Sequence, residues 1–234
     1  MSIIASFGSI GANARRLALA LAISFGIMHS DAAVAQLAPG YSGHSDAPRE
    51  GTEDQYWSVL REIGRCVARS KADGAVRFLA SAVDSQEEAG AFQALFAGQS
   101  NVCMQNTVRL VAPRAHIRGA IAEGLFKARY LQTATSAVLP ASGGEEEPPI
   151  RTLHDFARCY VKQDFLSARM LIVDTQLGTR GERDRVRQMA PDFSACFPEG
   201  VTLQINPPEV RMALAEALYV AVRDQMGRSV RGAD

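Results

Sequence analysis

The sequence lacks the features that mark several large functional classes. Its 25 basic and 25 acidic side chains give a net charge of zero, whereas a protein whose main work is to bind nucleic acid carries a strong basic excess. It has four cysteines, four histidines and no C-x-x-C pair, so the usual spacing of zinc ligands is missing. The glycine-rich motifs of nucleotide-binding loops and the G-x-S-x-G motif of serine hydrolases are absent as well. We therefore predict no metal, no cofactor and no nucleic-acid partner.

Long apolar runs are missing too, because no segment reaches the roughly 20 apolar residues that span a membrane. A shorter apolar run, 17–28, follows two arginines at 15–16 and precedes the small-x-small segment 33–35. These three parts, in this order, are typical of a secretory signal peptide. We expect cleavage between Ala35 and Gln36, which makes the mature protein soluble and periplasmic or secreted in a bacterium. An uncleaved anchor or an apolar helix of the fold is the alternative.

The cysteines that are present indicate an internal repeat. They form two pairs with the same spacing of 37 residues, Cys66 with Cys103 and Cys159 with Cys196. The second pair lies 93 residues after the first, and the same offset places 117–128 (IRGAIAEGLFKA) on 210–221 (VRMALAEALYVA) without a gap. Such self-similarity at a fixed offset predicts two tandem copies of one structural unit.

Two segments rich in glycine, proline, serine and charge separate the copies from the signal and from each other. Neither segment shows apolar periodicity, which is typical of flexible spacers. The predicted organisation is a signal peptide (1–35), a flexible leader (36–54), helical repeat 1 (55–131), a linker (132–149), helical repeat 2 (150–226) and a C-terminal tail (227–234).

Each copy is predicted to be a small all-α unit of about four helices. Apolar residues recur at helical spacing over 55–69 and 113–128 in the first copy, and over 151–163 in the second. Residue types that cap helix amino termini mark further helix starts. These are Asp73 and Asp164 for the second helices, the boxes 85–88 and 179–182 for the third helices, and the box 206–209 for the last helix of the second copy.

A unit of roughly 75 residues has a small core, so a disulfide bond would add to its stability. Four cysteines allow three connectivities, and the repeat favours the one that is the same in both copies. We predict that each bridge ties the first helix of its copy to the loop before the last helix, as Cys66–Cys103 and Cys159–Cys196. In the chain-entropy model each bridge stabilises its unit by about 3–4 kcal/mol.

Charged residues that recur in both copies are candidates for a structural or a binding role. They are Arg65 and Arg158 beside the cysteines, and Arg118, Glu123, Arg211 and Glu216 in the last helices. Five residues along a helix turn through about 500°, so Arg118 cannot pair with Glu123. We expect a structural salt bridge within each copy instead, Glu123 with Arg65 and Glu216 with Arg158. A role in ligand binding is the alternative.

Histidines that occur in only one copy are the remaining candidates. His116 and His154 have no histidine at the equivalent position, and His154 neighbours Asp155. A histidine beside a carboxylate could act as a general base, but a solvated helix residue has the same pattern far more often. We therefore predict no catalytic residue.

The last helices share the pattern R-x-A-[IL]-A-E-[AG]-L-[FY], which begins at Arg118 and at Arg211. With its duplicated cysteine–helix unit, the chain resembles an uncharacterised group of exported bacterial proteins over 57–130 and 150–223. No activity comes with this resemblance.

Three hypotheses about function remain. The first is a non-enzymatic protein of the cell envelope whose helical modules bind another protein. The second is a periplasmic binder of a small apolar or amphipathic ligand between helices, in a pocket lined by Phe92, Phe96, Leu125 and Phe126, or by Tyr160 and Tyr219. The third is an enzyme with an unfamiliar site around His154 and Asp155. The oligomeric state stays open.

Mass spectrometry of the exported protein should find Gln36 at the amino terminus, because signal peptidase cuts after the small-x-small segment 33–35. A purified protein that retains Met1 would show that this segment is not cleaved.

Overall fold

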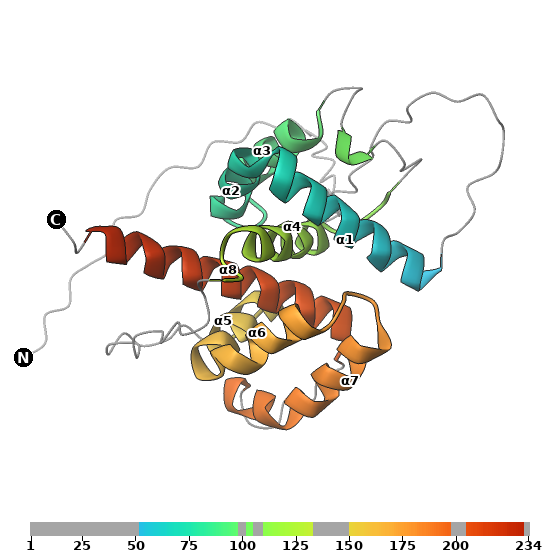
Figure 1. Ribbon diagram of the computed structural model, residues 1–234, viewed down its shortest axis with the longest axis vertical. Helices are drawn as coiled ribbons and strands as arrows, with labels where there is room; N and C mark the ends of the chain where they lie inside the picture. Colours follow the sequence, from blue (N-terminus) through green and yellow to red (C-terminus); the bar gives the residue numbers. More distant parts are fainter. Residues whose placement is uncertain (1–51, 98–101, 105–109, 133–149, 198–204, 232–234) are drawn as a thin grey trace, which may run out of the picture. The chain divides into compact units, whose positions relative to one another are not determined.

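The computed structural model describes residues 52–97, 102–104, 110–132, 150–197 and 205–231. These residues form eight α-helices and two 3₁₀ helices and contain no strand, which confirms the all-α prediction (Figure 1). The predicted signal peptide, most of the leader and most of the linker lie outside the described residues. None of the helices described is both long enough and apolar enough to cross a membrane.

The helices fall into two groups along the chain. The first half (52–132) contains α1 (Glu53–Ser70), α2 (Ala72–Ala80), α3 (Gln86–Phe96), η1 (Val102–Met104) and α4 (Arg114–Arg129). The second half (150–231) contains α5 (Leu153–Gln163), α6 (Phe165–Asp174), α7 (Arg180–Met189), η2 (Ala190–Cys196) and α8 (Pro207–Arg231). Helix α8 therefore continues past residue 226, where the sequence predicted the tail to begin.

Most predicted capping residues act as expected. Ser85, Asp164 and Thr179 each accept a hydrogen bond from the backbone N–H three residues later, at the starts of α3, α6 and α7. The prediction for Asp73 is wrong. Only Lys71 separates α1 from α2, so α2 begins at Ala72 and Asp73 lies inside its first turn, without a side-chain cap.

Helices α3 and α7 share an unusual start. The carboxylates of Glu88 and Glu182 accept hydrogen bonds from the backbone N–H of Asp84 (2.9 Å) and of Gly178 (2.8 Å), one residue before the capping residue. Both donors have left-handed backbone, with φ of 61° for Asp84 and 78° for Gly178. Glycine adopts this conformation freely and aspartate tolerates it. Ser85 and Thr179 therefore cap as predicted, whereas the return hydrogen bond of each glutamate goes to the residue before the capping residue.

Each half holds one disulfide in the predicted pairing. The Cys66–Cys103 bridge joins α1 to η1, and the Cys159–Cys196 bridge joins α5 to η2. The Cα–Cα distances are 5.4 and 5.8 Å. No disulfide joins the first half to the second half, so the two halves are held together by packing and by polar contacts.

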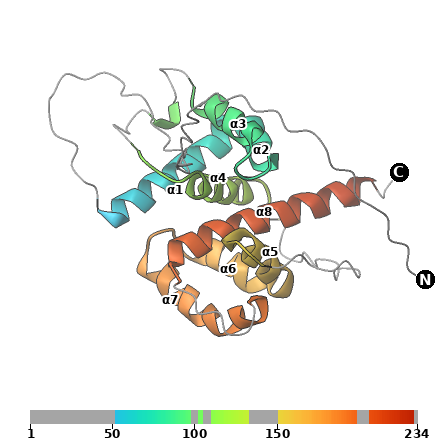
Figure 2. The same ribbon diagram turned by 180° about the vertical axis from the view of Figure 1, so that it is seen from behind.

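Helices α4 and α8 form the centre of the fold. They pack against each other, while α1 lies on the outer side of α4 and α5 lies on the outer side of α8 (Figures 1 and 2). The order α1, α4, α8, α5 therefore runs across the molecule, and α2 and α6 contact α4 and α8 in equivalent ways.

Glycines let helices α1 and α4 approach each other closely. A Cβ added at Gly64 of α1 would lie 2.1 Å from the carbonyl oxygen of Ala120 on α4, and one added at Gly124 of α4 would lie 2.4 Å from the carbonyl oxygen of Gly64. These neighbours are backbone atoms, which cannot rotate away. The contact between α1 and α4 therefore requires glycine on both helices.

Replacing Gly124 by alanine should destabilise the protein by about 1–3 kcal/mol, because the new Cβ forces α1 and α4 apart. The matched control is Gly90→Ala at an exposed position of α3, where a Cβ meets nothing within 4 Å and alanine should stabilise the helix by roughly 0.5–1 kcal/mol. Denaturant unfolding of the oxidised proteins measures both changes. Equal effects of the two substitutions would contradict the close helix contact.

Candidate functional site

Charged side chains are buried where the two halves meet. Arg118 and Glu123 of α4 face Arg211 and Glu216 of α8, and all four are buried. Two further buried carboxylates, Glu88 and Glu182, lie beside them. Buried charges persist only when they are paired and hydrogen-bonded, so we traced the partners of each guanidinium group.

Arg118 connects three elements. Its Nε and Nη2 donate to Oε1 of Glu216 on α8, at 3.0 and 2.5 Å, and its Nη1 donates to Oε1 of Glu88 on α3 at 2.9 Å. It also donates to backbone carbonyls at the end of α2, those of Phe78, Leu79 and Ser81. The guanidinium thereby satisfies carbonyls that a helix end leaves without intrahelical partners.

Arg211 of α8 makes the equivalent contacts from the second half to the first. It forms a two-pronged ion pair with Glu123 on α4, with N–O distances of 2.8 and 2.9 Å. Its other donors reach the end of α6, at the carbonyls of Leu171, Ile172 and Thr175. The Nε atom also lies 3.6 Å from Oε1 of buried Glu182 on α7.

The two arginine environments match almost residue for residue. Phe78 and Leu79 lie 93 residues before Leu171 and Ile172, whereas Ser81 and Glu88 lie 94 residues before Thr175 and Glu182. The extra residue belongs to α6, which has 10 residues against 9 in α2. The offset between matching residues therefore changes from 93 to 94 at the end of α6.

The predicted ion pairs within each copy are wrong. Arg65 pairs with Glu62 and Arg158 pairs with Asp155, each three residues earlier on its own helix. Their side chains are 57% and 58% exposed. Glu123 and Glu216 instead bind the arginine of the other half. The sequence prediction paired residues within one copy and so missed these pairs between copies. The Arg–Glu spacing that recurs in both last helices was the signal that could have indicated them.

The buried carboxylates have different proton affinities. Burial by itself would raise the pKa of Glu123, but Arg211 and Lys127 outweigh burial and hold this pKa below its ordinary value. For Glu182 burial prevails and raises the pKa to about 7, despite Arg211 and the N–H of Gly178. Glu182 therefore exchanges its proton near neutral pH, whereas Glu123 stays ionised there.

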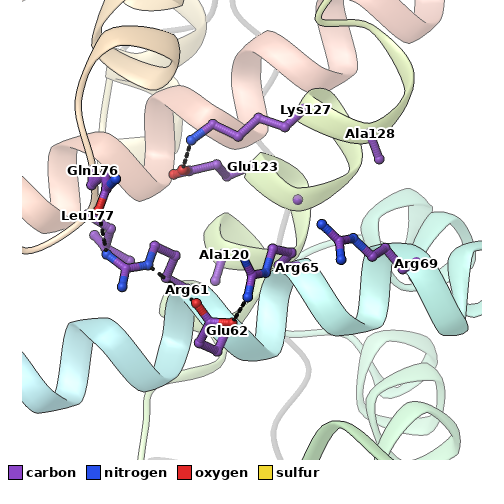
Figure 3. A pocket seen from close by; sticks show the side chains of 11 residues that line it. Arg61, Glu62, Arg65, Arg69, Ala120, Glu123, Lys127, Ala128, Gln176 and Leu177 are labelled. Atoms are coloured by element: carbon purple, nitrogen blue, oxygen red, sulfur yellow. Dashed lines mark hydrogen bonds and ion pairs between the residues drawn. The ribbon is translucent and has the colours of Figure 1, made fainter.

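A cleft of about 450 Å³ lies next to this network (Figure 3). One wall is the face of α1 that carries three arginines at helical spacing, and the floor is a face of α4 with small side chains. The loop after α6 closes one end. The lining residues are Arg61, Glu62, Arg65, Arg69, Ala120, Glu123, Gly124, Lys127, Ala128, Gln176 and Leu177.

The cleft carries an excess of positive charge, because four basic side chains line it against two carboxylates. Glu62 pairs with Arg65 and lies 3.8 Å from Nε of Arg61, and Glu123 accepts a hydrogen bond from Nζ of Lys127 at 2.7 Å (Figure 3). Glu123 also pairs with Arg211 on its buried side. Among the described residues, Arg69 has no ion-pair partner. Guanidinium and ammonium groups of this kind bind carboxylates and phosphates through charge-assisted hydrogen bonds.

One wall of the cleft belongs to the second half. Arg61 of α1 donates to Oε1 of Gln176 at 3.2 Å, and a Cβ on Gly178 would lie 2.6 Å from Cβ of Trp57 on α1. The same loop receives hydrogen bonds from Arg211 at Thr175. The shape of the cleft therefore depends on how the two halves pack.

The candidate histidines lie outside this cleft. Nδ1 of His116 is 2.7 Å from the hydroxyl of Tyr56, and burial lowers its pKa. Nδ1 of His154 lies 3.5 Å from Oε2 of Glu216. Asp155 instead caps α5 and binds Arg158, so the structure shows no His154–Asp155 ion pair. Within the described ranges, no cluster of three or more His, Cys, Asp or Glu could hold a metal ion.

The apolar side chains considered for a ligand pocket belong to the core or pack against it. Leu125, Phe126, Tyr160 and Tyr219 are completely buried, and the Phe92 and Phe96 rings contact each other at a centroid distance of 4.9 Å. Comparison with known proteins adds no relative: no protein-family model, curated protein or solved structure matches the chain. The basic cleft is therefore the candidate functional site on the strength of its own geometry.

Glu182→Gln should change how stability depends on pH. The folded protein keeps the proton of Glu182 up to about pH 7, against an ordinary pKa of 4.5, so wild-type stability falls as pH rises between these values. Glutamine cannot ionise. The free energy of unfolding of the variant, relative to wild type, should therefore rise by about 2 kcal/mol from pH 5.5 to pH 8.

Denaturant titrations at both pH values measure this difference, and Glu123→Gln is the control. The pKa of Glu123 is lowered, so its contribution is present above 4.5 and lost only at lower pH. Its variant should lose the same amount of stability at pH 5.5 and at pH 8. A pH-independent effect of Glu182→Gln would show that this carboxyl does not titrate near neutrality.

Proposed function

We propose that the protein is an exported, non-enzymatic binding module that holds an acidic segment of a partner protein in the cleft between α1 and α4. The observation that carries the proposal is the stripe of Arg61, Arg65 and Arg69 along one wall, opposite Lys127. The cleft has an excess of positive charge although the protein as a whole is neutral.

The spacing of the arginines suits an extended acidic peptide. Arg61 and Arg69 are eight residues apart on one helix face, which separates their Cα atoms by about 12 Å. An extended peptide covers this distance in about four residues. Several carboxylates could therefore bind at once, and guanidinium groups can engage each of them through two parallel hydrogen bonds.

Binding has more support here than catalysis. Arginine remains protonated throughout the ordinary pH range, so the groups that line the α1 wall orient an anion and do not exchange protons with it. The two histidines that could exchange protons have other partners. His116 is hydrogen-bonded to Tyr56, and His154 lies beside Glu216. An apolar ligand has less support, because the aromatic side chains expected to line its pocket fill the core.

The proposed location is the bacterial periplasm or the cell exterior. Disulfides persist in oxidising compartments, and the two bridges of this chain fit that setting. The segment before Gln36 has the signal-peptide pattern described above. In this proposal the two halves are tandem copies of one ancestral unit, and the partner is a protein of the cell envelope.

Charge reversal of the cleft should strongly weaken the binding of an acidic probe. The variant is Arg65→Glu with Arg69→Glu, and the probe is a fluorescein-labelled octaglutamate peptide followed by fluorescence anisotropy at low salt. We expect a loss of affinity of about a hundredfold, because two attractive contacts become repulsive. Wild-type affinity should also fall as salt rises.

The second half provides a matched control, Arg158→Glu with Lys162→Glu. These residues lie 93 positions after Arg65 and Arg69, and Arg158 has the same exposure and the same kind of carboxylate partner as Arg65. Both variants change the net charge equally. The proposal fails if wild type does not bind the probe, or if the two variants lose affinity to the same extent.

A further inference from the structure

The interface between α4 and α8 has the contact pattern of a symmetric dimer. Arg118 of α4 binds Glu216 of α8, and Arg211 of α8 binds Glu123 of α4. Each residue lies 93 positions from its counterpart, so exchanging the two halves converts one pair into the other. Reciprocal contacts of this kind define an isologous interface, which normally joins two identical chains.

The axis of this pattern passes between Gly119 and Met212. These two residues are also 93 positions apart, and they face each other across α4 and α8. A Cβ on Gly119 would lie 2.4 Å from Cβ and 2.6 Å from Cα of Met212. Met212 is itself buried. One half thus supplies a side chain at the axis, and the other supplies the space for it.

This pair makes the interface selective. Two halves that both carried methionine at the axis would overlap, and two halves that both carried glycine would leave a void. The combination of one glycine and one methionine fits only when the first half meets the second half. The good fit of glycine with methionine, and the overlap or void in the other combinations, then favour pairing of the first half with the second over pairing of two identical halves.

We infer that the α4–α8 interface is a specific protein–protein interface between two separable binding partners, the first half and the second half. Each half recognises the complementary half, whether that half comes from the same chain or from a second copy, and rejects an identical half. The covalent linker is not needed for their association. This inference does not depend on the proposed function of the cleft.

Cutting the linker in the full oxidised protein tests the inference. A recognition site for a sequence-specific protease is inserted between Ala141 and Ser142, and the folded protein is cleaved. No disulfide joins the two halves, so only the interface can hold the fragments together. We expect them to co-elute at micromolar concentration and to separate in denaturant. Fragments that separate without denaturant would overturn the inference.

Variants of the axis pair test the selectivity. Gly119→Met should raise the dissociation constant of the cleaved fragments by about a hundredfold, because a side chain is forced into a filled space. The exchanged variant, Gly119→Met with Met212→Gly, restores one side chain and one space and should recover most of the affinity. Failure of the exchanged variant to recover would contradict the role of this pair, even if the single variant folds poorly.

A mixing experiment tests partner choice. Cleaved protein with an affinity tag on the first half is mixed with untagged cleaved protein and then captured. The untagged second half should appear in the captured material, and the untagged first half should not. Recovery of the untagged first half would show that identical halves associate and would contradict the inference.

Discussion

Two buried arginines determine how the rest of this structure is assembled. Arg118 and Arg211 are almost inaccessible to solvent, so every donor needs a partner within the protein. Each guanidinium finds a carboxylate on the other central helix and carbonyls at the end of a short helix in its own half. One side chain thereby fixes three elements together. Removal of one member of such a pair generally costs about 3–5 kcal/mol, although an apolar replacement of the whole pair can be neutral. The arginines therefore join these elements in one specific geometry.

The same network reaches the surface at the cleft. Glu123 binds Arg211 on its buried side and Lys127 on its exposed side. The loop that carries Gln176 is held by Arg211 at Thr175 and by Glu182 at Gly178. The end wall of the cleft is thus supported from the interior. For the proposed ligand this end wall is preorganised, because its backbone loses little freedom on binding.

The sequence predicted the helices and disulfides well, and the arrangement of the helices poorly. Local signals suffice for a helix or a cap, as Ser85 and Asp164 show, and equal spacing suffices for the cysteine pairing. The partners of Glu123 and Glu216 depend on which helix faces which, and no local pattern contains that information. The cleft was missed for the same reason, because its wall at Arg61 lies against a loop 115 residues away at Gln176. Asp73 failed as a cap because only one residue, Lys71, separates α1 from α2, so Asp73 already lies in the first turn of α2.

The asymmetric pair at the centre has an evolutionary consequence. In a dimer of identical chains every substitution occurs twice, so a glycine can never face a methionine across the axis. A single chain with two halves is free of this restriction, because each half is encoded separately. The freedom extends to the surface: the positions equivalent to Arg61 and Lys127 hold His154 and Val220. If the halves are tandem copies, as proposed, they are therefore free to differ in the chemistry of their surfaces.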